Sequence, residues 1–364
     1  MSEQPKLLLG PGPSNAPKEV LEAMGRPLIG HMDPEFLAVL DGVNEKLRRV
    51  FGTGNRCTLP ISGTGSAGME AAFVNFVEPG ETVVVGVNGV FGERMAEVAA
   101  RAGATVVRVE APWGEPVDAG ALAAAAKKAR PALVAVVHGE TSTGVAQPLE
   151  EVAEAARDTG ALLVVDAVTT LGGMPLQVDE AGIDVCYSGT QKCLNVPPGL
   201  APLTAGDRAV AKLMARKTKV QSWYLDLGMI LKYMEGATRV YHHTAPVSMI
   251  HGLDAGLDVV LEEGLEARWA RHRDASAYLV ERMGELGFAP MVEDRYRLWS
   301  LTTFALPAGV EDSVRAEVMR RHRIEIGGGL GRLKGKAWRV GLMGTNARRE
   351  VVDRLVGALE DVLG

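Results

Sequence analysis

The sequence has few of the features that mark secreted, disulfide-stabilised or membrane-spanning proteins. Only three of its 364 residues are cysteines, Cys57, Cys186 and Cys193, and no two of them form a CxxC pair. They make no recognisable disulfide framework, so a reducing compartment, the cytoplasm, is the expectation. No uninterrupted apolar run approaches membrane-spanning length, and the first residues lack the basic and apolar regions of a signal peptide. We therefore expect no membrane association.

An excess of positive charge is also missing. Lys and Arg number 39 against 45 Asp and Glu, which gives a net charge of −6. Nucleic-acid-binding surfaces need clustered basic residues, whereas here they are scattered among acids, so we expect no nucleic-acid partner. Hydrophobic residues make up 47% of the chain and charged residues 23%, which is ordinary for globular proteins with a large core.

What the chain does contain is a regular alternation of short Val/Leu runs and helix-like segments. Continuous rather than alternating apolar runs indicate strands covered on both faces, as in a parallel sheet between helices. The runs predict an α/β architecture from about residue 55 to 245. The expected strands are 82–87, 105–110, 133–138, 162–168 and 185–189, and the expected helices include 34–51, 91–103, 119–129 and 149–160.

The pattern changes from about Val247. A long helical stretch with leucines at i+4 begins there, interrupted by Gly252, Gly256 and Gly264, so a bend or break is expected. The segments "LWSLTTFALP", "RIEIGGG" and "AWRVGLM" then predict strands flanked by helices, which is typical of a smaller α+β domain. We divide the chain into an N-terminal arm (1–20), a large domain (21–262) and a small C-terminal domain (263–364).

A glycine motif indicates a phosphate site. The segment "SGTGSAGME" (62–70) contains G-x-G-x-x-G before a helix-like run, and such glycines hold phosphates at helix N-termini. A dinucleotide site would also need a good preceding strand and an acidic residue about twenty positions later. The preceding "CTLPIS" contains a proline, and residues 86–89 contain no acid. We therefore favour a phosphomonoester.

Two further residues suggest which phosphate compound it is. Asp166 ends the strand-like "LLVVD", and Lys192 follows another short strand in "YSGTQK". A carboxylate and a lysine at the ends of parallel strands, facing a glycine-rich helix start, suit pyridoxal phosphate. Asp166 would pair with the ring nitrogen, and Lys192 would form a Schiff base with the aldehyde. The backbone N–H groups of Gly65, Ser66 and Ala67 would hold the phosphate.

Seven segments from residue 7 to 344 then make the whole chain resemble the fold-type I, class V pyridoxal-phosphate aminotransferases, in the alanine–glyoxylate and serine–pyruvate group. They are "LLLGPGPSNAP", "ISGTGSAGMEAA", "HGETSTGVAQPL", "LLVVDAVTTLGG", "IDVCYSGTQKCLNVPPGL", "YHHTAP" and "WRVGLMG". The resemblance implies a large domain with a mostly parallel seven-stranded sheet between helices, a smaller α+β domain, and a homodimer with shared active sites.

The resemblance also implies roles around the cofactor. Phe91 would stack on the ring face, Ser142 would lie near the phenolic oxygen and the substrate, and Val168 would contact the cofactor. Thr190 and Gln191 would hydrogen-bond to the phosphate or to the loop around it. The structural alternatives are a core phenylalanine at Phe91 and simple turn chemistry at Ser142.

Other roles concern the substrate and the dimer. Arg339 would bind the substrate's α-carboxylate, with a structural salt bridge as the alternative. Gly12 would lie at the substrate mouth. Tyr241 and Thr244 would reach across the dimer interface to the neighbour's phosphate. We expect no metal, because the adjacent His242 and His243 have no third ligand at suitable spacing.

The resulting hypothesis is transamination between alanine or serine and glyoxylate or pyruvate. Another donor such as aspartate stays open, because Arg26, Arg332 or Lys334 could supply a second anion contact. A desulfurase-like lyase is disfavoured, since it needs a cysteine in the small domain and all three cysteines precede residue 194. A non-catalytic cofactor-binding protein is a third alternative that no residue supports. The sequence leaves the physiological donor, acceptor and pathway open.

Overall fold

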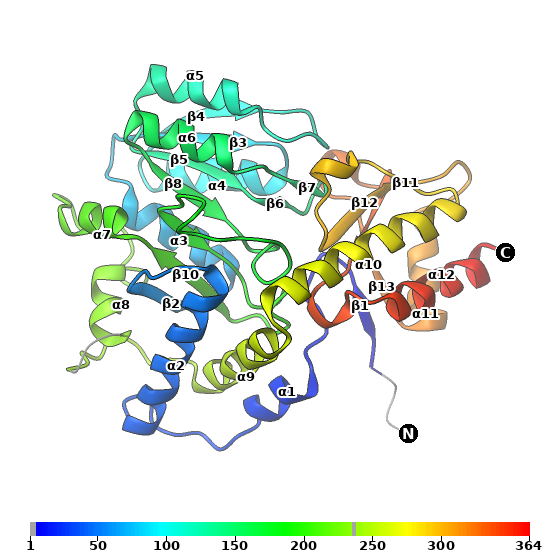
Figure 1. Ribbon diagram of the computed structural model, residues 1–364, viewed down its shortest axis with the longest axis horizontal. Coiled ribbons are helices and arrows are strands. Elements are labelled where there is room, and N and C mark those ends of the chain that lie inside the picture. Colours follow the sequence, from blue (N-terminus) through cyan, green and yellow to red (C-terminus); the bar gives the residue numbers. More distant parts are fainter. Residues whose placement is uncertain (1–4, 235–237) are drawn as a thin grey trace.

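A seven-stranded sheet forms the centre of the larger of two units in the computed structural model, which describes residues 5–234 and 238–364 (Figure 1). Strand β10 is antiparallel to both of its neighbours, and the other strands are parallel to one another. The mostly parallel seven-stranded sheet is therefore confirmed. Across the sheet the order is β2 (Cys57–Ser62), β10 (Leu200–Ala205), β9 (Val185–Tyr187), β8 (Leu162–Asp166), β5 (Leu133–Val137), β3 (Thr82–Val87) and β4 (Thr105–Glu110).

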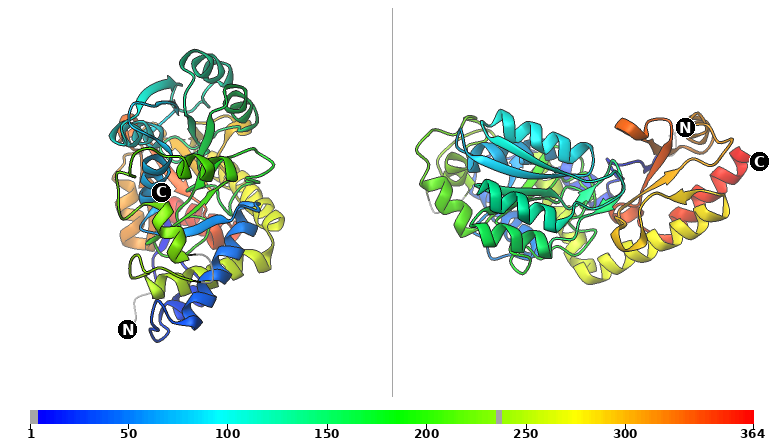
Figure 2. Two further views of the ribbon diagram at one scale, coloured as in Figure 1. Left: turned by 90° about the vertical axis from the view of Figure 1, so that its left-hand side faces the viewer. Right: turned by 90° about the horizontal axis from the view of Figure 1, so that it is seen from above.

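Helices cover both faces of this sheet, as Figure 2 shows. The central strands β5 and β8 are buried along their whole length, which is why they consist of continuous Val, Leu and Ala rather than an alternating pattern. The helices of this unit are α1 (Lys18–Met24), α2 (Pro34–Phe51), α3 (Gly65–Phe76), α4 (Val90–Arg101), α5 (Ala119–Ala129), α6 (Glu150–Thr159), α7 (Asp207–Met214), α8 (Leu227–Met234) and α9 (Val247–Glu263).

The segment "CTLPIS", which we judged a poor strand because of its proline, forms β2. It lies at the edge of the sheet and pairs only with β10, where Pro60 faces Pro202. An edge strand tolerates proline because one of its sides has no hydrogen-bonding partner to lose.

The predicted interruption of the long helical stretch occurs at Gly264. This residue has a φ of 82° and separates α9 from α10 (Leu265–Glu285). Gly252 and Gly256 remain inside α9, where a side chain on either would collide with Met24 or Val196. These two glycines therefore serve close packing, and only the third ends the helix.

The smaller unit contains a five-stranded sheet that includes the N-terminal segment. Strand β1 (Leu7–Leu9) pairs in parallel with β13 (Ile324–Gly328). The sheet continues through β14 (Ala337–Gly341), β12 (Leu301–Ala305) and β11 (Ala289–Pro290), and is packed with α10, α11 (Val314–His322) and α12 (Arg349–Leu363). The expected N-terminal arm thus contributes a strand to the C-terminal unit, and its residues 1–4 lie outside the described residues.

No helix in the described ranges is both long and apolar enough to cross a bilayer. In the same ranges, no group of three or more His, Cys, Asp or Glu residues is arranged to hold a metal ion.

Candidate active site

A cavity of about 180 Å³ lies at the carboxyl ends of the parallel strands, where open α/β sheets place their ligand sites. Asp166 is the last residue of β8, Lys192 follows β9, and helices α3 and α4 begin after β2 and β3. The predicted residues that line the cavity are Gly65, Ser66, Phe91, Asp166, Val168, Gln191 and Lys192. The walls also contain residues that we did not predict, namely Thr64, Met69, Arg94, Val137, Gly139, Thr141 and Thr169.

The N-terminus of α3 presents free donors to the cavity. Its N-cap residue Thr64 makes no side-chain hydrogen bond to the helix, and among the described residues the N–H groups of Gly65 and Ser66 have no hydrogen-bond partner, so they keep their partial positive charge. Gly65 and Ser66 lie at the cavity wall, whereas the N–H of Ala67 donates to the Thr64 carbonyl at 2.7 Å. A Cβ on Gly65 would lie 3.2 Å from Val168. This end of the cavity therefore suits a small anion such as a phosphate.

Asp166 is a buried carboxylate for which the charge of Lys192, at the same cavity, offsets only part of the cost of burial. It is 3% exposed and accepts a hydrogen bond of 2.9 Å from the Val168 N–H. Burial raises its pKa to about 6, because the charged form loses its hydration. Among the described residues, no Lys, Arg or His forms an ion pair with it. A protonated ring nitrogen is the kind of group that would compensate this charge.

Lys192 points its amine at the N-terminal segment. Its Nζ donates to the Pro11 carbonyl, and its own carbonyl accepts from the Ser14 hydroxyl at 2.8 Å. Gly12 has a φ of 107°, and a Cβ there would lie 2.7 Å from Nζ, so this position has no room for a side chain. Burial lowers the pKa of Lys192 to about 8, and the nearby Arg339 acts in the same direction. The amine is therefore partly unprotonated near neutral pH.

The two residues before the lysine differ in orientation. The amide oxygen of Gln191 is buried at the cavity wall and has no hydrogen-bond partner among the described residues. Because an amide offers both donors and an acceptor, this side chain fits a polar ligand group. The Thr190 hydroxyl donates to the Pro197 carbonyl at 2.8 Å, so it holds its own loop instead of facing the cavity.

Glu140 is a residue that sequence reasoning missed. It lies in the hairpin of β6 (Gly139–Glu140) and β7 (Val145–Ala146), and it is fully buried. One carboxylate oxygen accepts from the N–H groups of Phe91 and Gly92, at 2.9 and 3.1 Å, so Glu140 caps α4. Burial raises the pKa of this carboxyl. An acid three residues after the buried strand β5, in "HGETSTG", is the signal that could have identified it.

The structure does not bring Ser142 to the cavity. Its hydroxyl donates to Glu140 at 2.6 Å and accepts from the Val90 N–H at 3.0 Å. The neighbouring Thr141 lines the cavity instead. Ser142 is not among the residues that line the cavity, and its role near the cofactor stays a prediction.

Arg339 lies on β14 beside the cavity wall and is 8% exposed. Its Nε donates to the Gly328 carbonyl at 2.8 Å and Nη1 to the Thr141 carbonyl at 3.2 Å. No carboxylate of the described chain forms an ion pair with it, so the structural salt bridge that we considered receives no support. The guanidinium charge can bind an anion.

Tyr241 and Thr244 do not line the cavity within one chain. Both are exposed, and the Tyr241 ring packs against that of His31 with ring centres 5.4 Å apart. Between them, His243 contacts the Ser62 hydroxyl at 2.7 Å and His242 at 2.8 Å. The two histidines therefore brace the end of β2.

The chain is similar over almost its whole length to known aminotransferases. The family model described as aminotransferase class-V matches residues 7–353. The alanine–glyoxylate aminotransferase of Callithrix jacchus is 42% identical over 362 residues, which cover 98% of this chain and 87% of the relative. The (S)-ureidoglycine–glyoxylate transaminase of Bacillus subtilis is 38% identical over 378 residues, with 98% and 90% covered. A crystal structure of the Nostoc alanine–glyoxylate aminotransferase has a TM-score of 0.97 and 48% identity, covering 100% of this chain and 97% of that structure.

Proposed function

Since the chain belongs to the class V aminotransferase family, we propose that it transfers the amino group of alanine or serine to glyoxylate or pyruvate, with pyridoxal phosphate as cofactor. The observation that carries this proposal is the meeting of the Lys192 amine, the Asp166 carboxylate and the α3 N-terminus in one cavity. When bound, pyridoxal phosphate supplies an aldehyde for the lysine and a ring that accepts electrons from the substrate.

The cavity walls match the parts of this cofactor. The N–H groups of Gly65 and Ser66, with the Gln191 amide, hold the phosphate. Asp166 stabilises a protonated ring nitrogen, which in turn relieves the cost of burying its own charge. Phe91 offers an aromatic face against which the ring can stack.

Lys192 acts as the acid–base group. Because its pKa is lowered to about 8, its Nζ can both take up and release a proton near neutral pH. Its Nζ removes the proton from the substrate's Cα, while the Arg339 fork holds the α-carboxylate and fixes the direction of that bond.

A desulfurase-like lyase lacks a nucleophile here. Cys57, Cys186 and Cys193 are all buried, and none lines the cavity. Burial raises the pKa of Cys193, which keeps this thiol protonated. The three buried cysteines form no disulfide, which also supports the proposed cytoplasmic location.

One observation favours an acidic donor such as aspartate as a second candidate. Arg94 lines the cavity with its guanidinium 5.0 Å from the centre of the Phe91 ring. It forms no ion pair among the described residues, so it can meet a second carboxylate. None of Arg26, Arg332 and Lys334, which the sequence suggested for this role, lines the cavity.

We also propose that the enzyme is a homodimer in which Tyr241 and Thr244 reach the partner's phosphate site. Several large hydrophobic side chains are exposed near these residues. Monomeric proteins rarely expose so many apolar side chains in one region of the surface. They are Leu28, Met32, Trp223, Tyr224, Val240 and Tyr241. A second copy of the chain would cover them.

The substrate proposal is tested by mixing the cofactor-loaded protein with single amino acids and following the visible absorbance of lysine-bound pyridoxal phosphate. Alanine and serine should discharge it faster than aspartate. A faster reaction with aspartate that is lost in Arg94→Gln would establish the second candidate. No discharge by any amino acid would contradict transamination altogether.

A further inference from the structure

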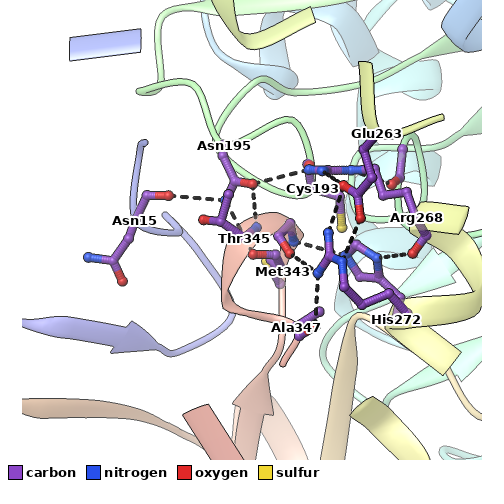
Figure 3. A network of polar contacts seen from close by, with 12 residues as sticks. Asn15, Cys193, Asn195, Glu263, Arg268, His272, Met343, Thr345 and Ala347 are labelled. Atoms are coloured by element: carbon purple, nitrogen blue, oxygen red, sulfur yellow. Dashed lines mark hydrogen bonds and ion pairs between the residues drawn. The ribbon is translucent and has the colours of Figure 1, made fainter. Parts of the chain in front are cut away.

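A polar network outside the cavity ties the lysine-bearing turn to the small unit and to the N-terminal segment (Figure 3). Its centre is Asn195, three residues after Lys192, and both ends of its side-chain amide make several hydrogen bonds. Nδ2 donates to Ser14 Oγ (2.8 Å), Asn15 O (3.1 Å) and Met343 O (3.2 Å), and Oδ1 accepts from the Thr345 N–H (2.7 Å) and from Arg268 Nη2 (3.2 Å).

Arg268 of α10 holds the same turn from the other side. Its side chain is 1% exposed, donates to the Cys193 carbonyl at 2.6 Å and to the Gly172 carbonyl at 3.1 Å, and pairs with Glu263 at 2.5 Å. Arg271 binds the same Glu263. All three nitrogens of this buried guanidinium have hydrogen-bond partners. Moving any partner away would leave the buried charge without full compensation, so the network holds these neighbours at fixed distances.

The backbone at Asn195 has a conformation that is unfavourable for most residues, which indicates that the surrounding contacts hold it in place. Its φ of 55° is a left-handed conformation that residues other than glycine rarely adopt, and its N–H donates to the Lys192 carbonyl at 3.2 Å. Any side chain on Gly344 would overlap the Asn195 amide. The turn that carries the lysine and the segment after β14 are therefore in direct contact through this side chain, and Cys193 and Met343 of the same two segments belong to one hydrophobic cluster.

The two segments joined in this way carry the two groups that must act together. Lys192 begins one of them, and Met343 lies four residues after Arg339 of β14 in the other. We propose that Asn195, held by Arg268, is a positioning residue that sets the separation of the Lys192 amine from the Arg339 guanidinium. This inference rests on the proposed function, in which Lys192 removes the Cα proton of the substrate and Arg339 binds its α-carboxylate.

The expected consequence is a defect in the chemical step more than in binding. Without the Asn195 side chain, Arg339 still binds the substrate's carboxylate, but the Lys192 amine is no longer held close to the substrate's Cα proton. A displacement of about 1 Å can cost on the order of 100-fold in rate. The loss should therefore fall on kcat.

Asn195→Gly is the sharpest variant, because glycine keeps the left-handed backbone and removes all contacts of the amide. We expect kcat to fall by at least about tenfold, with KM for alanine changed by less than about threefold, and with the lysine-bound cofactor absorbance retained. Asn195→Asp keeps the acceptor for Thr345 and Arg268 but loses the donors, so its kcat should lie between those of Asn195→Gly and the wild type.

Asn75→Ala is the matched control. This asparagine is also buried and donates to the Ala71 and Leu225 carbonyls, but it lies far along α3 from the cavity. It should lower the melting temperature without the fall in kcat. Equal losses of kcat in the two variants, an unchanged kcat in folded Asn195→Gly, or a change confined to KM would each overturn the proposal.

Amide hydrogen exchange of the cofactor-free protein gives a readout that needs no activity. In Asn195→Gly, the Thr345 amide and the segment 190–196 should exchange faster together, whereas Asn75→Ala should leave both unchanged. Unchanged exchange at Thr345 would refute the coupling. A wild type that takes up no pyridoxal phosphate would refute the proposed function instead, so the two failures can be told apart.

Discussion

Burial shifts the pKa values of Asp166 and Lys192, two ionisable groups that line the cavity, in opposite directions, each toward its neutral form. The pKa of Asp166 rises to about 6 and that of Lys192 falls to about 8. Both shifts arise because the cavity removes water from a charge without supplying a full counter-charge. A cationic ring and an aldehyde bound between them would offset both costs of burial. The cofactor-free protein is therefore less stable than the cofactor-bound protein.

Asp166→Asn should therefore stabilise the cofactor-free protein while abolishing transamination. Above pH 6 the wild type must keep an ionised carboxylate buried, which costs about 3 kcal/mol relative to the unfolded chain. Below about pH 4 the carboxyl is protonated in both states, so the gain vanishes. Denaturant titrations between pH 4 and 8 should show the advantage of the variant growing up to pH 6 and then levelling. A gain that does not depend on pH would contradict this origin.

The sequence predicts residues at strand ends better than residues in hairpins. Asp166 and Lys192 could be placed because the carboxyl ends of parallel strands share one edge of the sheet. Ser142 and Thr141 are adjacent, and of the two only Thr141 lines the cavity, whereas the Ser142 hydroxyl donates to Glu140. That choice depends on tertiary packing, and local sequence does not encode it.

At the scale of the element, α4 depends on a cap from a distant hairpin. Its N-cap residue is Gly89, which has no side chain to offer, and a side chain there would overlap Ser142 and Glu140. The Glu140 carboxylate supplies the missing acceptor and a negative charge at the positive end of the helix. The position of Phe91, the second residue of α4, follows from this contact.

Glu140→Gln should weaken cofactor binding about tenfold and lower the melting temperature, because the new NH₂ group opposes N–H donors and leaves one of them unpaired. Asp184→Asn is the control, since Asp184 also accepts a backbone N–H bond, from Leu163, but pairs with Arg208 away from the cavity. It should lose stability and keep its affinity. Equal affinities in wild type and Glu140→Gln would show that the cap does not act on the site.

Val-rich strands and the Ala-rich helix were the easiest elements to predict, even where much of the element is exposed, as in β4 at the edge of the sheet. The strands 82–87 and 105–110 and the helix 119–129 match β3, β4 and α5. In contrast, β2 was hidden by Pro60, because tolerance of a proline depends on the position of a strand in the sheet. The roles of Gly252 and Gly256 depend likewise on Met24 and Val196, which are distant in sequence.

At the scale of the whole molecule, the N-terminal segment links the two units in a way that no local pattern encodes. Leu7–Leu9 joins the small sheet, and a few residues later Pro11 and Gly12 lie on Lys192 of the large unit. Only the resemblance of the entire chain to a family suggested that this segment belongs to the site.

Shared sites predict subunit complementation. Lys192→Ala and the double variant Tyr241→Ala, Thr244→Ala should each be nearly inactive alone. When the two are unfolded, mixed and refolded together, heterodimers contain one intact site, so activity should return to about a quarter of the wild-type value. Recovery confined to background would mean that each site is built from one chain.

The most direct test of the central claim is to load the protein with pyridoxal phosphate, reduce it with borohydride and map the modified peptide by mass spectrometry. We predict a single modified residue, Lys192, with Lys192→Ala unlabelled and Lys212→Ala labelled as in the wild type. A label on another lysine, or no label at all, would contradict the account.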